Sequence, residues 1–213
     1  ESVMSKAWNK KIFENIQKKV DQSSKDLAEE RGACPDAADY DIKERFSNKT
    51  AIAPTASISI ICGGTSPGVE PIAANSYTHK TLSGSFNVRN KYLKKLLAKH
   101  NKDDDETWSS ITTNQGSVSH LDFLTKDEKD VFKTAFELDQ KWIVELSADR
   151  TPHISQAQSI NVFLPADVHK KELHQIHFQA WKKGLKSLYY CRSKSIQRAE
   201  NINDAKSTDI TAN

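Results

Sequence analysis

The chain has 213 residues and a formal net charge of +3, and 28% of its residues are charged while 37% are apolar. With the 7 glycines added, the apolar share reaches roughly 40%, which is below the ~45–50% that is usual for globular domains. The lack of any run of ~18 apolar residues and the low counts of cysteine, glycine and proline exclude a membrane-spanning helix, a disulfide scaffold and a collagen-like chain.

The first part of the chain begins with a helical pattern. Residues 5–31 predict a helix that ends at Gly32, in which lysine and glutamate fill the exposed face and the apolar residues recur at helical spacing on the other: Trp8, Ile12, Ile16, Val20 and Leu27. A short helix is expected over residues 42–46. Residues 50–72 hold few ionisable groups, with a strand-like start at residues 51–53 and an apolar run at 58–61. We expect such a segment to be buried on both sides.

The second part alternates between helical and strand-like patterns. Strand or loop is expected over residues 73–88, and helices over 90–100, 107–113 and 127–147. The last of these begins with a capping box of Thr125 and Glu128 and turns a row of apolar residues inward: Val131, Phe132, Ala135, Leu138, Trp142, Ile143 and Leu146. A short strand at 160–163, a basic amphipathic helix at 167–187 and a buried strand at 187–192 follow. The pattern is typical of a helix-rich α/β protein.

The three cysteines predict a reduced, cytoplasmic protein. Cys34, Cys62 and Cys191 are far apart and odd in number, and no C-x-x-C motif occurs. The first residues have no basic region followed by an apolar core, so they do not form a signal peptide. Because the chain starts without methionine and enters a helical pattern at once, we expect it to be part of a longer protein or one half of a split one.

Residues 54–59, the hydroxyl loop, combine small residues with three hydroxyl groups from Thr55, Ser57 and Ser59. Such a segment can hold a phosphate group between backbone amides and hydroxyls without a lysine. The same residues also suit a buried strand whose hydroxyls bond to neighbouring carbonyl groups, and the residue types alone favour this second interpretation.

Tyr189 and Tyr190, the tyrosine pair, are adjacent in sequence. On a regular strand their side chains would point to opposite faces, one into a core and one toward solvent. The alternative uses the reversible one-electron oxidation of tyrosine: where the backbone departs from strand geometry, the two rings can stack and pass a radical between them.

Residues 166–200 contain eight lysines and arginines against three acidic residues. This excess fits a solvated helix face, an acidic partner or a nucleotide. Nucleic acid is not expected, because no aromatic stacking motif is interleaved with the cations. His174 and His177 are three residues apart but have no third ligand in sequence, so we expect no metal site in this chain.

Taken together, six segments resemble the carboxy-terminal part of the large (α) subunit of class I ribonucleotide reductase. They occur in the order of that family and cover most of the chain: RGACP at residues 31–35, ERFS at 44–47, IAPTASIS at 52–59, GTSPGVEP at 64–71, QAQSIN at 156–161 and GLKSLYY at 184–190. The resemblance implies a segment of a ten-stranded α/β barrel over residues 1–194, completed by a partner chain, and a flexible tail over 195–213.

The resemblance also implies roles for the two motifs. The hydroxyl loop would bind the diphosphate of a ribonucleoside diphosphate substrate, and its residues are Pro54, Thr55, Ala56, Ser57, Ile58 and Ser59. The tyrosine pair would belong to the radical-transfer path, with Tyr190 receiving the oxidising equivalent from the small (β) subunit and Tyr189 passing it on. The basic helix would bind the acidic carboxy-terminal peptide of the small subunit.

Other parts of the family pattern are missing from the 213 residues. The Asn-x-Cys-x-Glu finger loop, the substrate-reducing cysteine pair and the cysteines of the carboxy-terminal tail do not occur. We therefore expect the catalytic cysteines and the nucleotide effector sites (ATP, dNTP) on an amino-terminal partner chain, and the dinuclear metal with its tyrosyl radical on the small subunit. The alternative is a non-catalytic remnant that binds the small subunit through its basic helix.

Overall fold

The computed structural model describes residues 1–81 and 84–193 and divides them into two compact units. Unit 1 consists of Glu1–Pro54 and the described residues from Asp139 onward, and unit 2 consists of Thr55–Leu138. The tail expected over residues 195–213 lies outside the described residues. No helix in the described part of the chain is both long and apolar enough to cross a membrane.

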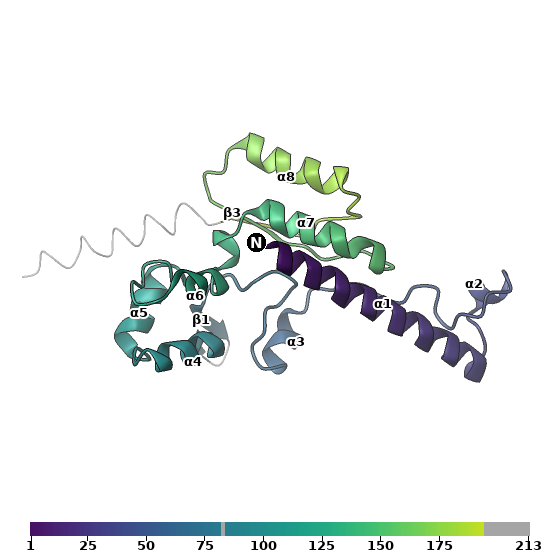
Figure 1. Ribbon diagram of the computed structural model, residues 1–213, viewed down its shortest axis with the longest axis horizontal. Coiled ribbons are helices and arrows are strands. Elements are labelled where there is room, and N and C mark those ends of the chain that lie inside the picture. Colours follow the sequence, from purple (N-terminus) through teal and green to yellow (C-terminus); the bar gives the residue numbers. More distant parts are fainter. Residues whose placement is uncertain (82–83, 194–213) are drawn as a thin grey trace, which may run out of the picture. The chain divides into compact units, whose positions relative to one another are not determined.

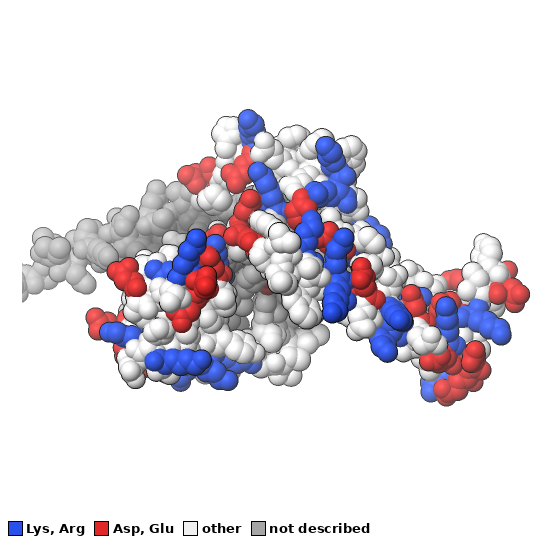
Figure 2. Space-filling model, in the orientation of Figure 1, with Lys and Arg blue, Asp and Glu red and all other residues white. Residues whose placement is uncertain are grey.

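Three helices of unit 1 lie in one row, in which α7 (Gln140–Arg150) packs between α1 (Val3–Arg31) and α8 (Lys170–Lys182) (Figure 1). Helix α1 begins at Ser2, whose hydroxyl accepts a hydrogen bond from the Ser5 amide, and it ends at Gly32 with a φ of +82°. Basic and acidic side chains alternate along the visible face of α1 (Figure 2). The short elements α2 (Pro35–Ala38) and η2 (Thr151–His153) follow α1 and α7.

Parallel strand pairing accompanies this row of helices. Strand β3 (Val162–Leu164) pairs in parallel with β4 (Cys191–Ser193), and Ile52 forms a parallel bridge with Gln158. One small core joins these strands to the helices, and it consists of Val144, Val162, Leu164, Ile176 and Ala180. Each extended segment of unit 1 therefore follows a helix and pairs in parallel with its neighbour, as in α/β proteins.

Arg150 connects the elements of unit 1 beneath this core. Its guanidinium group is buried and donates to the side chains of Asn9, Ser147 and Gln158 at 3.1, 2.8 and 3.0 Å. The Gln158 amide in turn donates to the Ser147 carbonyl oxygen at 2.9 Å. A buried charge is tolerated only when its donors are satisfied, and this network satisfies it with groups from α1, α7 and the QAQSIN segment.

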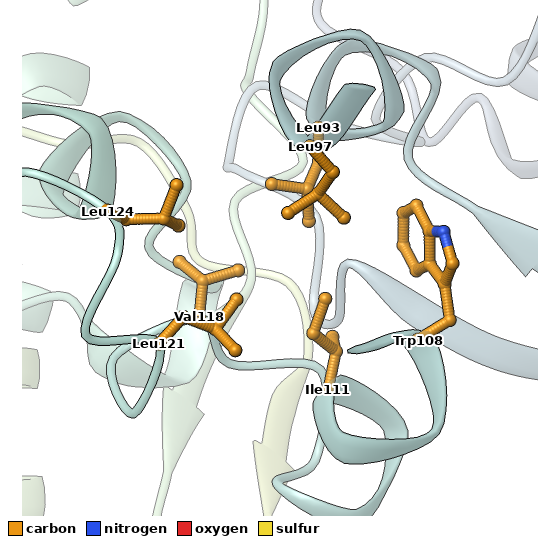
Figure 3. Packing of buried hydrophobic residues seen from close by; sticks show 7 residues of the cluster. All are labelled: Leu93, Leu97, Trp108, Ile111, Val118, Leu121 and Leu124. Atoms are coloured by element: carbon orange, nitrogen blue, oxygen red, sulfur yellow. The ribbon is translucent and has the colours of Figure 1, made fainter. Parts of the chain in front are cut away.

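Unit 2 begins with α3 (Ala56–Ile61), followed by the antiparallel strands β1 (Ser76–Thr81) and β2 (Gly84–Arg89). Then come α4 (Lys91–Lys99), α5 (Asp105–Thr113), α6 (Lys126–Val131) and η1 (Ala135–Glu137). Figure 3 shows the core of this unit, in which side chains from α4 and α5 face those of the following loop: Leu93, Leu97, Trp108, Ile111, Val118, Leu121 and Leu124.

Asn75 anchors the loop before β1 to the rest of unit 2. Its side chain is almost fully buried and donates to the carbonyl oxygens of Gly116 and Phe132 at 2.9 and 2.7 Å. It also accepts a hydrogen bond from the Asn90 side chain at 2.8 Å. The same unit holds Gly116 at a φ of +82° against the backbone of Ala74.

The helices expected over residues 5–31, 90–100 and 107–113 are confirmed, as is the capping box of Thr125 and Glu128. The basic helix is also confirmed, although α8 is shorter than the predicted range. The strand expected at 160–163 is present as β3, slightly later in the chain.

Several predictions of local structure are wrong. The apolar run at residues 58–61 is not buried, because it lies in α3 with Ile58, Ile60 and Ile61 exposed. The short helix forms at α2 instead of residues 42–46. The single helix expected over 127–147 is divided into α6, η1 and α7, because Thr134 and Glu137 form a second capping box and Asp139 caps α7.

Three burial predictions are wrong as well. Trp8, Ile12 and Ile16 of α1 are largely exposed, because α1 packs on α7 through a different face that includes Asn9. Val131 is 75% exposed at the end of α6, where the helix stops before turning this residue inward. The strand expected over 187–192 is reduced to β4, and its three residues are exposed.

Candidate functional site

The hydroxyl loop is the start of α3 and not a strand. Thr55 is the N-cap residue, and the amides of Ala56, Ser57 and Ile58 form the first turn, in which the helical pattern provides no acceptor. The first intrahelical bond runs from the Ser59 amide to the Thr55 carbonyl oxygen at 2.8 Å. Three neighbouring amides are therefore left to bond with groups from outside the helix.

The three hydroxyl groups of the loop are used differently. Thr55 donates its hydroxyl to the Pro67 carbonyl oxygen at 3.0 Å, and buried Ser59 donates to the Ala56 carbonyl oxygen at 2.7 Å. The exposed hydroxyl of Ser57 makes no hydrogen bond with any described residue. Of the three, Ser57 is thus the one whose hydroxyl proton is available to a ligand.

The segment after α3 turns back on the helix and holds its shape. The Gly64 amide donates to the Ser59 carbonyl oxygen at 2.9 Å, and both Gly63 and Gly64 have positive φ. The Lys91 ammonium group donates to the Gly63 carbonyl oxygen at 2.8 Å. The glycines of the sequence motif therefore allow a turn that a side chain at φ +70° to +90° would strain.

The tyrosine pair has its two rings in contact. The ring centroids of Tyr189 and Tyr190 are 4.0 Å apart with an interplanar angle of 48°, and the Tyr189 hydroxyl donates to the Tyr190 hydroxyl at 3.3 Å. The two side chains are about half exposed. Adjacent residues of a regular strand could not meet in this way, and both tyrosines precede the first residue of β4.

The backbone of the pair is held to the strand segment that leads into β3. The Tyr189 amide donates to the Ile160 carbonyl oxygen at 2.7 Å, and the Val162 amide donates to the Tyr190 carbonyl oxygen at 2.9 Å. The hydrogen bond to Tyr190 is the main cause that raises the pKa of Tyr189 above its ordinary value of 10.0, because ionisation would remove the shared proton.

Lys186 fixes the segment between α8 and the tyrosine pair. Its ammonium group donates to three consecutive carbonyl oxygens, those of Ile154, Ser155 and Gln156, at 3.2, 2.7 and 3.1 Å. In the sequence, Lys186 counts among the cations of the basic helix. The sequence alone does not show whether a lysine binds carbonyl groups, as this one does, or faces solvent.

The basic helix α8 has two distinct faces. Ile176 and Ala180 are buried on one side, whereas Phe178 and Trp181 are 49% and 73% exposed, with ring centroids 5.6 Å apart. Lys183 pairs with Glu145 at 2.8 Å, so it contributes to packing within unit 1. The exposed face thus combines two aromatic rings with the remaining cations of α8: Lys170, Lys171 and Lys182.

His174 and His177 of α8 each contact a different group of the chain. The His174 ring stacks on Phe178 at 6.0 Å, and His177 donates its Nδ1 proton to the Leu173 carbonyl oxygen at 2.8 Å. No group of three or more potential metal ligands occurs in the part of the chain that the structure describes.

Comparison with known proteins identifies the family to which the chain is similar. The family described as "Ribonucleotide reductase, barrel domain" matches residues 36–191. The ribonucleoside-diphosphate reductase large subunit of Invertebrate iridescent virus 6 is 48% identical over 195 residues, which cover 90% of this chain and 20% of that relative. The large subunit of Danio rerio is 32% identical and matches 99% of this chain and 31% of its own length.

A solved structure gives the same result. The class Id ribonucleotide reductase alpha subunit of Actinobacillus ureae superposes with a TM-score of 0.83 at 37% identity, over 91% of this chain and 35% of that one. The chain spans about a fifth to a third of the length of these relatives. This chain therefore belongs to the ribonucleotide reductase large-subunit family and represents a part of its barrel domain.

Proposed function

We propose that this chain acts within a ribonucleoside-diphosphate reductase, which converts ribonucleoside diphosphates to deoxyribonucleoside diphosphates by radical chemistry. In this proposal the chain supplies the substrate-phosphate loop and two tyrosines of the radical path. The contact between the rings of Tyr189 and Tyr190, with their shared hydrogen bond of 3.3 Å, supports it most directly. Membership in the reductase family supports the reaction type.

The tyrosine pair would carry the oxidising equivalent in two steps. Oxidation of a phenol at neutral pH removes one electron together with the hydroxyl proton, so each step needs an acceptor for both. Tyr190 would be oxidised first, through the small subunit, and would then take an electron and a proton from Tyr189 along their hydrogen bond. Tyr189 would next oxidise a cysteine thiol that is not among the 213 residues.

The hydroxyl loop would hold the substrate diphosphate at the start of α3. The amides of Ala56, Ser57 and Ile58 and the Ser57 hydroxyl would donate to phosphate oxygens, with Pro54 leading the chain into the turn. No acidic side chain lies within residues 54–59 to repel the anion. Thr55 and Ser59 would shape the loop, since their hydroxyls donate to carbonyl oxygens nearby.

Other parts of the enzyme would lie outside this chain. The parallel pairs of unit 1 would be strands of a ten-stranded barrel that is completed by the amino-terminal part of the large subunit. That part would supply the thiyl-radical cysteine, the reducing cysteines and the effector sites for ATP and dNTP. The small subunit would provide the dinuclear metal and tyrosyl radical, and the complex would work in the cytoplasm.

The exposed face of α8 would bind the small subunit. An acidic peptide with apolar residues fits a surface where Phe178 and Trp181 are flanked by lysines, because the cations attract it and the rings bury its apolar groups. The small subunit would thus be held close to the tyrosine that it oxidises.

The test combines this chain with the remaining large-subunit sequence and the small subunit, and compares Tyr190→Phe with Tyr92→Phe. Phenylalanine preserves the ring but cannot form a neutral radical by losing a hydroxyl proton. We expect deoxyribonucleotide formation to be abolished by Tyr190→Phe and retained by Tyr92→Phe, since exposed Tyr92 lies on α4 of unit 2. Full activity of Tyr190→Phe would contradict the proposal, and the same activity without this chain would instead favour a non-catalytic binding module.

A further inference from the structure

Tyr190 is held between two groups. Its ring contacts Tyr189 at a centroid distance of 4.0 Å, and the guanidinium carbon of Arg192 lies 5.4 Å from its centroid. The side chain is 53% exposed, so the packing of unit 1 does not fix the ring by itself. Arginine over an aromatic face is an attractive arrangement, because the cation meets the negative face of the ring.

The strand register explains why Arg192 lies near this ring. Arg192 pairs with Phe163 in the β3–β4 ladder, and Tyr190 precedes it by two residues. Residues two apart on an extended chain point to the same face, so the ladder directs Arg192 toward Tyr190. Tyr189 reaches Tyr190 only because the chain is irregular before β4.

We propose that Arg192 is a positioning residue for the tyrosine pair: its guanidinium group holds the Tyr190 ring against Tyr189, so that the hydrogen bond between the two hydroxyls persists. This inference rests on the proposed radical path. In that path the O–H bond of Tyr189 breaks and an O–H bond forms on the Tyr190 radical, while one electron moves with the proton from Tyr189 to Tyr190. The radical is thereby transferred to Tyr189, and the step requires the two oxygens to stay within hydrogen-bond distance.

Tyr190 and Arg192 shift the pKa of Tyr189 in opposite directions, so a positioning role of Arg192 can be told apart from a purely electrostatic one. The hydrogen bond to Tyr190 raises the pKa of Tyr189, whereas the positive charge of Arg192 lowers it. If Arg192 holds the ring, Arg192→Gln weakens the hydrogen bond as well as removing the charge. The pKa of Tyr189 then falls, because the hydrogen bond is the largest cause of its shift and the charge is the smallest. If Arg192 acts only as a charge, the same variant raises the pKa of Tyr189.

The experiment places a fluorotyrosine at position 189 of the complete chain and follows its fluorine NMR shift against pH. We expect Arg192→Gln to lower the midpoint by about 0.5 pH unit, which corresponds to about 0.7 kcal/mol and to a partial loss of the hydrogen bond. Lys182→Gln, which removes the same charge from α8, should leave the midpoint unchanged. A raised or unchanged midpoint in Arg192→Gln would overturn the inference.

Circular dichroism of each variant tests whether the chain is folded. We expect folded variants, because Arg192 is exposed. The titration does not depend on nucleotide reduction, so it can succeed or fail independently of the proposed function. Activity of Tyr190→Phe decides the radical path, and the direction of the fluorine shift decides the role of Arg192.

Discussion

Ile52 and Tyr189 are hydrogen-bonded to opposite edges of the same extended segment. Ile52 donates its amide to the Ala157 carbonyl oxygen and accepts from the Ser159 amide, at 3.2 and 2.8 Å. Tyr189 donates to the Ile160 carbonyl oxygen at 2.7 Å. Because backbone groups of successive residues alternate between the two edges of a strand, odd-numbered residues bond to one neighbour and even-numbered residues to the other.

This relationship holds the backbone of the tyrosine pair in one layer of unit 1. The chain enters the hydroxyl loop at Pro54, two residues after Ile52, and the tyrosine pair opens the strand on the other edge. Each of the three neighbouring segments follows a helix of the row α1, α7 and α8. Consecutive helix–strand units of this kind are the repeating element of parallel α/β folds.

Substitution of Ser57 by alanine tests the hydroxyl loop. The Ser57 hydroxyl makes no hydrogen bond with the described residues, so its removal leaves the loop intact while it deletes one donor to a bound phosphate. A hydrogen bond to a charged group is worth about 1.5–3 kcal/mol, which predicts a loss of affinity of about tenfold or more for ribonucleoside diphosphate. Equilibrium binding of ribonucleoside diphosphate to the assembled enzyme measures this loss of affinity.

Ser59→Ala is the matched control for this experiment. Its buried hydroxyl donates to the Ala56 carbonyl oxygen and does not face a ligand. We expect it to lower the stability of unit 2 by about 1 kcal/mol and to change substrate affinity less than Ser57→Ala does. Equal losses of affinity in the two variants would argue against the assigned role of Ser57.

Gly116 is predicted to be a position where even alanine is not tolerated. A Cβ atom there would lie 2.6 Å from the Ala74 Cα and 2.8 Å from the Asn75 amide nitrogen, and the φ of +82° disfavours any side chain. Gly116→Ala should destabilise unit 2 by about 3 kcal/mol or more, as steric overlap adds to backbone strain. Gly64→Ala, with φ +70° and no atom within 4 Å, should cost only about 1 kcal/mol in the same urea titration.

The pH dependence of stability in unit 2 is predicted to involve Glu128. Its carboxylate accepts hydrogen bonds from the Thr125 amide and from His100, and these lower the pKa from 4.5 to about 2. A lowered pKa in the folded state means that the stabilisation is complete above the ordinary value of 4.5 and is lost as the pH falls toward about 2. The unfolding temperature should therefore decrease through this window.

Glu128→Gln should flatten that decrease, because glutamine cannot be protonated in this range. Asp127→Asn removes a neighbouring carboxylate that makes no hydrogen bond or ion pair with the described residues, and it should leave the decrease unchanged. Thermal unfolding followed by circular dichroism between pH 7 and 2 compares the three proteins. Parallel curves for the wild type and Glu128→Gln would contradict the role of this capping box.

The sequence predicted α4 better than the segments 58–61 and 127–147, for physical reasons. In α4 the apolar side chains recur on one face over two turns, so their period identifies both the helix and its buried side, which includes Leu93 and Leu97. Residues 58–61 have isoleucines typical of strands, but the Thr55 hydrogen bonds to the Pro67 carbonyl oxygen and the turn at Gly63 define the ends of a six-residue helix instead. Here the ends of the element outweigh the propensity of its middle.

The break within residues 127–147 could have been found from the sequence. Thr134 and Glu137 repeat the spacing of Thr125 and Glu128, and both pairs form capping boxes. The contact between Tyr189 and Tyr190 could not have been decided in this way, because it depends on where β4 begins. The different uses of Lys186 and Lys182 likewise depend on carbonyl groups that are distant in sequence.

Trp181 is predicted to contribute strongly to small-subunit binding. It is 73% exposed on the face of α8 opposite to Ile176 and Ala180, so its truncation removes an aromatic contact without opening the core. Aromatic residues at the centre of an interface commonly contribute 2 kcal/mol or more, which predicts a loss of affinity of about thirtyfold for Trp181→Ala. Fluorescence anisotropy of a labelled small subunit measures this loss, and Gln175→Ala, an exposed change on the same helix, is the control. Because the flanking lysines would attract an acidic peptide, wild-type affinity should also fall as salt is raised. Equal affinity of Trp181→Ala and Gln175→Ala would place the small subunit on another surface.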